Sequence, residues 1–120
     1  MKYVTKNPTK DTKYVIMDDK KQEILYLSKK VKLTTARAMV AERCYAEKID
    51  VRQQDDPKIY LYEYKEAVLG KTIAIGCGWV EYKGRTYGKM IDGLTHKKYL
   101  ANPVSGQRLN VDWPIYFHTM

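Results

Sequence analysis

Residues 72–91 read TIAIGCGWVEYKGRTYGKMI, and this stretch decides the fold. Its first eleven residues are rich in the β-branched and aromatic side chains that strands favour. Lys83-Gly84 follows as a two-residue turn, and glycine supplies the positive φ that such a turn demands. The stretch therefore predicts a β-hairpin in which residues 85–91 return beside residues 72–82.

The two faces of the first strand of this hairpin differ in side-chain size. The large residues that we expect on one face are Ile73, Ile75, Cys77 and Trp79. The opposite face holds small residues, which are Ala74, Gly76 and Gly78. Small residues inside a strand are typical of a bulge or of a close contact with another element, so we expect one of these there.

Upstream, residues 59–64 read IYLYEY and alternate strictly between two faces. Ile59 and Leu61 are predicted core residues. The opposite face carries a tyrosine stripe, which consists of Tyr60, Tyr62 and Tyr64. Two alternatives remain for the stripe: it is exposed and binds a partner, or the helix covers it and it belongs to the core.

Residues 34–49, TTARAMVAERCYAEKI, predict the main helix. The two threonines can cap its first amide groups, and its alanines favour helix by propensity. The helix face is small-residued, so we expect it to lie close against a sheet; this face comprises Ala38, Ala41, Tyr45 and Ile49. Asp55-Asp56-Pro57 then breaks the chain.

The remaining segments complete a predicted order ββαβββ. Residues 14–17 and 23–27 are expected to form a hairpin around a polar turn. Residues 94–100 suggest a helical turn, and residues 109–117 an edge strand limited by Pro114. The expected fold is α+β: an antiparallel sheet of about five strands with one main helix on one face. Residues 1–120 form one compact domain in this prediction, with residues 1–12 as a flexible arm.

Basic residues gather at the two ends of the 120-residue chain, whose formal net charge is +8. Residues 1–33 hold nine lysines against four acids, and residues 67–120 hold seven basic residues against three acids. Residues 34–66 are nearly neutral, with six basic residues against seven acids. If the two ends meet in the fold, they form a single basic patch.

The expected compartment is the cytoplasm. The first ten residues, MKYVTKNPTK, are polar and lack a signal peptide, so Cys44 and Cys77 are expected to be free thiols. The longest apolar run, residues 73–80, is far shorter than the ~20 residues of a membrane-spanning helix.

No motif predicts catalysis. Gly70-Lys71-Thr72 resembles the end of a phosphate-binding loop, but the glycine required five residues earlier is Lys65, and a strand follows instead of a helix. His96 and His118 are too far apart, and the cysteines lack paired spacing, for a metal site. The chain is therefore predicted not to be an enzyme and to hold no cofactor or metal.

The surviving signal is a basic and aromatic surface. Lysine and arginine neutralise phosphates, and tyrosine rings offer stacking faces to bases. The predicted nucleic-acid-binding residues are Lys29, Lys30, Lys32, Tyr82, Lys83, Arg85, Tyr87 and Lys89, and the predicted partner-binding residues are Tyr60, Tyr62 and Tyr64.

The order strand–turn–strand–helix over residues 13–49 resembles the arm-type DNA-binding modules of phage integrases, in element order alone. The lysine-rich and tyrosine-rich composition is also similar to that of accessory proteins of phages and mobile elements. Our leading hypothesis is a non-catalytic domain that contacts nucleic acid or a nucleoprotein through basic hairpins. The alternative is a protein-directed inhibitor or adaptor, such as an anti-defence (anti-CRISPR-like) protein. Tyrosine and arginine are enriched in protein interfaces too, so composition does not separate these hypotheses.

Overall fold

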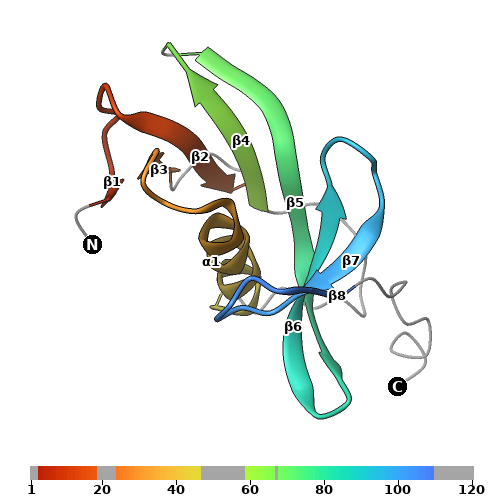
Figure 1. Ribbon diagram of the computed structural model, residues 1–120. Helices are drawn as coiled ribbons and strands as arrows, with labels where there is room; N and C mark the ends of the chain where they lie inside the picture. Colours follow the sequence, from red (N-terminus) through yellow and green to blue (C-terminus); the bar gives the residue numbers. More distant parts are fainter. Residues whose placement is uncertain (1–2, 19–23, 47–58, 67, 110–120) are drawn as a thin grey trace.

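The computed structural model of the chain describes residues 3–18, 24–46, 59–66 and 68–109. They form one antiparallel sheet and one helix (Figure 1), as predicted for an α+β fold. The described strands run in the order β1-β3-β2-β4-β5-β6-β7-β8 across the sheet. The elements are β1 (Val4–Thr5), β2 (Thr12–Asp18), β3 (Ile24–Ser28), α1 (Leu33–Ala46), β4 (Ile59–Lys65), β5 (Val68–Tyr82), β6 (Arg85–Asp92), β7 (Lys98–Ala101) and β8 (Arg108–Leu109).

Eight strands in the described part of the chain replace the expected sheet of about five. Residues 3–5 were expected to belong to a flexible arm, but Val4 pairs with Leu27 and the Ser28 amide donates to the Tyr3 carbonyl at 2.9 Å. The side chains of Tyr3 and Val4 pack against the core, and this burial holds the short strand β1 on the edge of β3.

The helical turn expected over residues 94–100 is also wrong. The chain turns at residues 93–95 and enters β7 at Lys98. The next two side chains, Tyr99 and Leu100, pack into different clusters on opposite faces of the sheet. An alternating pair of this kind is satisfied by a strand and not by a helical turn.

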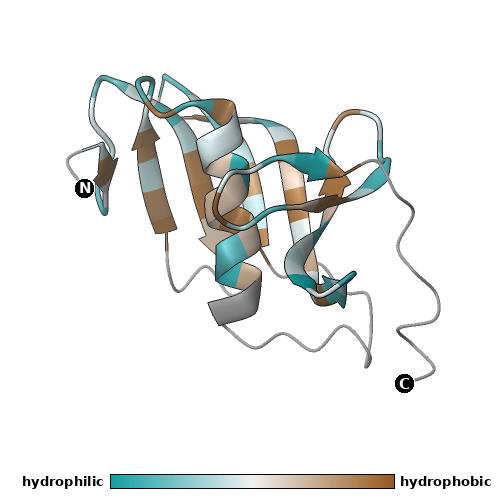
Figure 2. Cartoon of the chain, turned by 60° about the horizontal axis from the view of Figure 1, so that its bottom comes forward, coloured by the Kyte–Doolittle hydropathy of each residue, from teal (hydrophilic) through white to brown (hydrophobic). Residues whose placement is uncertain are grey.

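Helix α1 packs on β4, β5 and β6 (Figure 2), which confirms that it lies close against the sheet. Its residues in the core cluster are Ala36, Val40, Ala41 and Cys44, so only Ala41 of the predicted face lies there, and the side chains of Tyr45 and Ile49 are outside the described part of the chain. A Cβ atom added at Gly88 would lie 2.5 Å from the Cβ of Ala41, and one added at Gly76 would lie 2.6 Å from the Sγ of Cys44. Glycine at these two positions therefore permits the close approach. The helix begins at Leu33, so Thr34 lies in its first turn and does not cap it as expected.

The core has two parts on opposite faces of the sheet. The larger cluster lies under α1 and includes Ile59 and Leu61, which confirms both as core residues. The smaller cluster consists of Cys77, Val80, Tyr87 and Leu100.

A bulge at Gly78 (φ 143°) shifts the register between β5 and β6. As a result Trp79 pairs with Gly88, which faces α1. A second register shift, between β4 and β5 at Leu61 and Tyr62, leaves Ile73 as the extra residue, and it packs against the helix-side cluster. The expected grouping of Ile73 and Trp79 with Cys77 is therefore wrong, because strict alternation does not survive a bulge.

Several predictions concern residues that the structure does not describe. They are the turn after Asp18, the helix end at Ile49, the break at 55–57 and the strand beyond Leu109. Within the described residues, no helix is long and apolar enough to cross a membrane.

Candidate binding surfaces

The β5–β6 hairpin ends in the predicted tip, which we define as Tyr82, Lys83, Gly84 and Arg85. Tyr82 pairs with Arg85, and Lys83 and Gly84 have φ values of 51° and 78°. Two positive φ values in a two-residue connection match the turn class whose twist suits a hairpin. The tip projects from the lower end of the sheet in Figure 1.

The hairpin tip carries two exposed cations beside an anchored ring. Lys83 and Arg85 are exposed, whereas Tyr82 is half-buried. The Lys83 Nζ lies 5.3 Å from the centre of the Tyr82 ring, and the Tyr82 and Tyr87 rings meet edge to face at 6.4 Å. Tyr82 thus packs on Tyr87, while the charged groups of Lys83 and Arg85 remain in solvent.

Two predicted nucleic-acid-binding residues are buried. Tyr87 is 9% exposed and Lys89 is 1% exposed. Both lie on the face of β6 opposite α1, where Lys89 pairs with Gly78 of β5 and Leu100 of β7. Sequence alternation places the two side chains on one face, and the smaller core cluster lies on that face. Tyr87 and Lys89 therefore stabilise the hairpin from within and do not belong to its accessible surface.

The other predicted basic group lies in the turn between β3 and α1. Lys29, Lys30 and Lys32 are all exposed. Lys29 forms an ion pair with Asp11 at 3.7 Å, and the Lys30 Nζ lies 5.6 Å from the centre of the Tyr3 ring. A surface hollow of about 370 Å³ adjoins them; it is lined by Tyr3, Thr5, Thr9, Lys10, Asp11, Thr12, Ser28 and Lys30.

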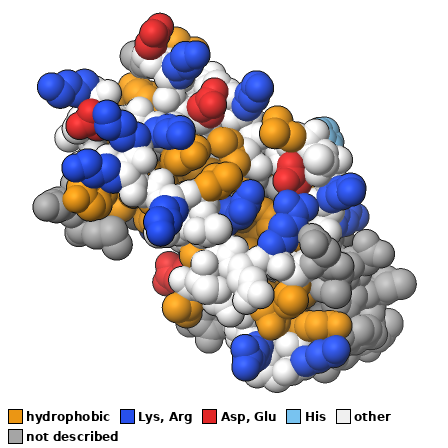
Figure 3. Space-filling model, in the orientation of Figure 1, with side chains coloured by type: hydrophobic (Ala, Val, Ile, Leu, Met, Phe, Trp, Pro, Cys, Tyr) orange, Lys and Arg blue, Asp and Glu red, His pale blue; other side chains and the backbone are white. Residues whose placement is uncertain are grey.

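The two basic groups form separate surfaces. In the sheet, β3 and β6 are four strand positions apart, which is roughly 19 Å at about 4.8 Å per strand. The hairpin tip projects further still (Figure 1), and Figure 3 shows that other cationic side chains lie between the two ends of the face in view. The chain ends therefore do not bring their described lysines into one patch.

The tyrosine stripe lies on the face opposite α1, because Ile59 and Leu61 occupy the helix side. All three stripe residues are half-buried. The Tyr60 and Tyr62 rings stack at 5.8 Å, and the Tyr64 ring meets Tyr26 edge to face at 5.6 Å. The sequence analysis did not assign Tyr26 to this surface, although the alternation of side chains along β3 could have placed it there.

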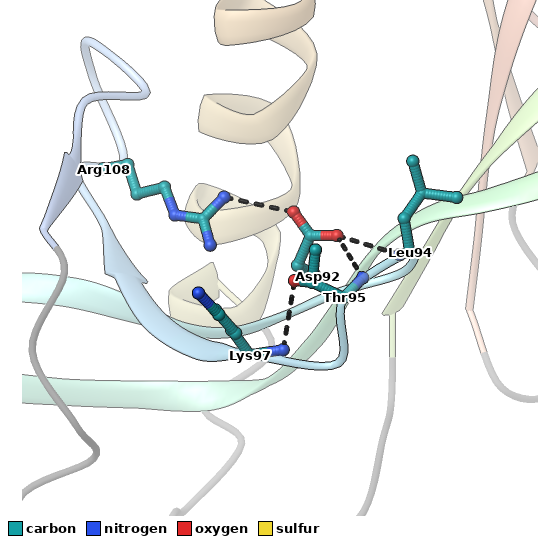
Figure 4. A network of polar contacts seen from close by, with 5 residues as sticks. All are labelled: Asp92, Leu94, Thr95, Lys97 and Arg108. Atoms are coloured by element: carbon teal, nitrogen blue, oxygen red, sulfur yellow. Dashed lines mark hydrogen bonds and ion pairs between the residues drawn. The ribbon is translucent and has the colours of Figure 1, made fainter.

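A polar network holds the β6–β7 turn (Figure 4). Asp92 Oδ1 accepts hydrogen bonds from the Leu94 amide at 2.8 Å and the Thr95 amide at 3.0 Å. Its Oδ2 accepts one from Arg108 Nη1 at 3.1 Å. Burial raises the pKa of Asp92, but the amides of Thr95 and Leu94 and the Arg108 guanidinium outweigh it and lower the pKa overall.

The Arg108 guanidinium also lies 4.0 Å from the centre of the buried Tyr99 ring, a cation–π contact. Burial raises the pKa of the Tyr99 hydroxyl, although the charges of Arg37 and Arg108 oppose this. The network therefore ties β8 to the β6–β7 turn and has a structural role.

Cys44 and Cys77 are both buried, form no disulfide, and lie in the two different core clusters. Within the described ranges, no three histidine, cysteine or acidic side chains gather as a metal site would need. The chain matches no family model, no curated protein and no solved structure in comparisons with all three. Any function must therefore be inferred from the geometry of this chain alone.

Proposed function

We propose that the chain is a non-catalytic binding domain that contacts nucleic acid, alone or in a nucleoprotein, through the hairpin tip. One observation carries the proposal: a two-residue turn presents Lys83 and Arg85 to solvent at the end of a projecting hairpin. Two cations at the end of a narrow hairpin can contact a phosphate backbone without removing water from a wide protein surface.

The rest of the hairpin supports this role by limiting motion. Tyr82 is fixed by the Tyr87 ring, which belongs to the smaller core cluster with Cys77 and Val80. The cations are therefore displayed on a supported strand pair and not on a loose loop, which reduces the ordering entropy lost on binding. The net charge of +8 adds long-range attraction for a polyanion.

A salt titration tests the proposal. A labelled single strand and a labelled duplex are each titrated with the protein at several salt concentrations, and fluorescence anisotropy gives the affinity. If phosphates are neutralised, the affinity falls with salt with a logarithmic slope of about 0.9 per phosphate for a duplex and about 0.7 for a single strand. An affinity that does not change between dilute and physiological salt would remove the proposal.

A second candidate function is a protein-directed inhibitor or adaptor that uses the tyrosine stripe. The observation that favours it is the position of Tyr60, Tyr62 and Tyr64 on the face that α1 leaves uncovered, with part of each ring accessible. Such rings give a protein interface large contact area at low entropic cost. Purification of partners from lysate with and without nuclease distinguishes the two: nuclease-sensitive retention favours the first function, and one resistant protein favours the second.

A further inference from the structure

Strand β5 is longer than either strand that flanks it. β4 pairs with residues 68–76 of β5, whereas β6 pairs with residues 74–82. Among the described strands, residues 68–72 therefore have a paired neighbour on one side and an open edge on the other (Figure 1). An open edge presents backbone amide and carbonyl groups to which another strand can bind.

The open edge starts where β6 turns away. The Gly93 amide donates to the Ile73 carbonyl at 2.9 Å, just beyond Asp92 and Ala74, which are the last paired residues of β6 and β5. A Cβ atom at Gly93 would lie 1.9 Å from the Thr72 carbonyl oxygen, so the turn passes very close to the strand. Asp92 holds this turn in place, and none of the described strands pairs with residues 68–72 on the side where a longer β6 would lie.

Three exposed apolar side chains lie on or beside this unpaired stretch of β5. Val68 is 63% exposed, Leu69 is 42% exposed, and Leu94 on the adjoining turn is 69% exposed. Open edges pair readily with other chains, and proteins limit this pairing with charge, proline, bulges or a covering element. This edge has a charged side chain, Lys71, and a register shift opposite Tyr62 and Tyr64, but it also exposes aliphatic residues. Three exposed aliphatic residues beside an open edge are typical of an interaction site.

The charges at this edge indicate the kind of partner. Lys71 lies on the edge and Lys97 on the adjoining turn, and both are exposed, as is Lys65 at the end of β4. Against these three cations stand two carboxylates: Glu63, which lies against Gly70, and the exposed Glu66, so the local excess is one positive charge. A second copy of the chain would bring a further net charge of +8 to the edge, which opposes self-pairing. An extended segment with acidic side chains is instead attracted, and its apolar residues can cover Val68 and Leu69.

We propose that the edge Val68–Thr72 is a docking site for an acidic, extended segment of a partner protein, which adds a strand in the place that β6 vacates. Main-chain hydrogen bonds would supply affinity, and the alternating apolar and acidic side chains would supply specificity. The site lies at the end of β5 opposite the hairpin tip, so it does not rest on the proposed nucleic-acid contact.

The test uses a short fluorescent peptide in which valine alternates with glutamate, titrated against the full chain. We expect it to bind and to slow hydrogen exchange of the amides in residues 68–72. Lys71→Glu removes the attraction and Leu69→Ser removes apolar contact, and each should weaken binding about tenfold or more. The double variant Lys83→Ala/Arg85→Ala, which alters only the opposite end of β5, should bind the peptide as the parent does.

Two peptide controls can overturn the proposal with the unaltered chain, and a third measurement uses the Leu69→Ser variant. A peptide with lysine in place of glutamate should bind far more weakly, and equal binding would exclude charge recognition. A peptide N-methylated at alternate amides should not bind, and parental affinity would exclude strand addition. Dimers of the free chain that Leu69→Ser dissociates would assign the edge to a second copy.

Discussion

Strand β5 takes part in two hairpins with opposite chemistry. The β5–β6 hairpin ends in the exposed cations Lys83 and Arg85 on a two-residue turn. The β4–β5 hairpin instead exposes the aliphatic residues Val68 and Leu69. Between the two ends, Gly76 of β5 lies against α1, so the central part of the strand is fixed.

The difference shows what each end can bind. Exposed cations are well hydrated, stable in the free protein and attracted to polyanions over a distance that salt controls. Exposed aliphatic residues gain free energy only when they are covered, at roughly 25 cal/mol per Å² of buried apolar surface. We therefore expect the two hairpins to bind different partners, and each prediction below tests one part of this comparison.

The largest expected effect comes from the central anchor, on which both hairpins depend. Gly88→Ala places a Cβ atom 2.5 Å from the Cβ and 2.6 Å from the Cα of Ala41, so the helix backbone must move. We expect the free energy of unfolding to fall by about 3 kcal/mol, the upper range for overpacking, in a urea titration.

The matched control is Gly70→Ala in the apolar hairpin, where the nearest atom is Glu63 Oε1 at 2.8 Å. That atom ends a flexible side chain and can move aside, so stability should change by less than about 1 kcal/mol. Equal losses for the two variants would show that α1 does not anchor β5 as tightly as the distances require.

The contrast between these glycines also shows what sequence can predict. Lys83-Gly84 defines a hairpin locally, since two residues and their φ preferences determine the turn. The small face at Gly76 predicted a close contact or a bulge, and β5 has both: a contact at Gly76 and a bulge at Gly78. The strict alternation of residues 59–64 likewise assigned Ile59 and Leu61 correctly to the core.

What sequence did not predict is which elements cover each face. Tyr87 and Lys89 occupy alternate positions typical of an exposed strand, yet they lie in and beside a second core to which Leu100 of β7 contributes. β7 is only four residues long, and β1 only two, so neither has a recognisable pattern. The open edge of β5 depends on the exact residue at which β6 turns away, which no local pattern gives.

The next prediction concerns the stripe at the base of the apolar hairpin. Tyr62 is half-buried, stacks on Tyr60 and pairs with Val15, which is fully buried. Tyr62→Ala should lower the free energy of unfolding by about 2 kcal/mol, less than the 3–5 kcal/mol typical of fully buried aromatic residues. A thermal or urea melt measures this loss.

Leu61→Ala, on the helix side of the same strand, is the control and should cost more. Affinity for nucleic acid should not change in Tyr62→Ala, because the hairpin tip lies elsewhere. A stable Tyr62→Ala protein that no longer binds nucleic acid would move the binding surface from the tip to the stripe.

The hairpin tip itself gives the next effect in size. Lys83→Ala/Arg85→Ala leaves Gly84 in place, so the turn should form and stability should change by less than about 0.5 kcal/mol. We expect affinity for nucleic acid to fall at least tenfold, about 1.4 kcal/mol, together with a shallower salt slope.

The matched control removes two exposed lysines elsewhere in the chain, Lys65→Ala/Lys97→Ala, and changes the net charge by the same amount. A clearly smaller loss in the control would assign the effect to the tip. Equal losses in both would mean that only overall charge matters.

The smallest effect is pH-dependent and concerns the turn beside the open edge. The folded pKa of Asp92 lies below its ordinary value of 3.8, so its carboxylate stabilises the fold above that value. This contribution to stability is lost as pH falls through the lowered folded pKa. At neutral pH, Asp92→Asn should lower the free energy of unfolding by about 1 kcal/mol or less, as for other partly exposed ion pairs, and the deficit should vanish in acid.

The control is Asp11→Asn, which breaks the exposed pair with Lys29 and should change stability by under about 0.5 kcal/mol. Since Asp92 holds the turn that borders residues 68–72, Asp92→Asn should also lower the affinity for the acidic peptide and leave the affinity for nucleic acid unchanged. A stability deficit that persists unchanged into acid would mean that the charge of the Asp92 carboxylate does not contribute to stability.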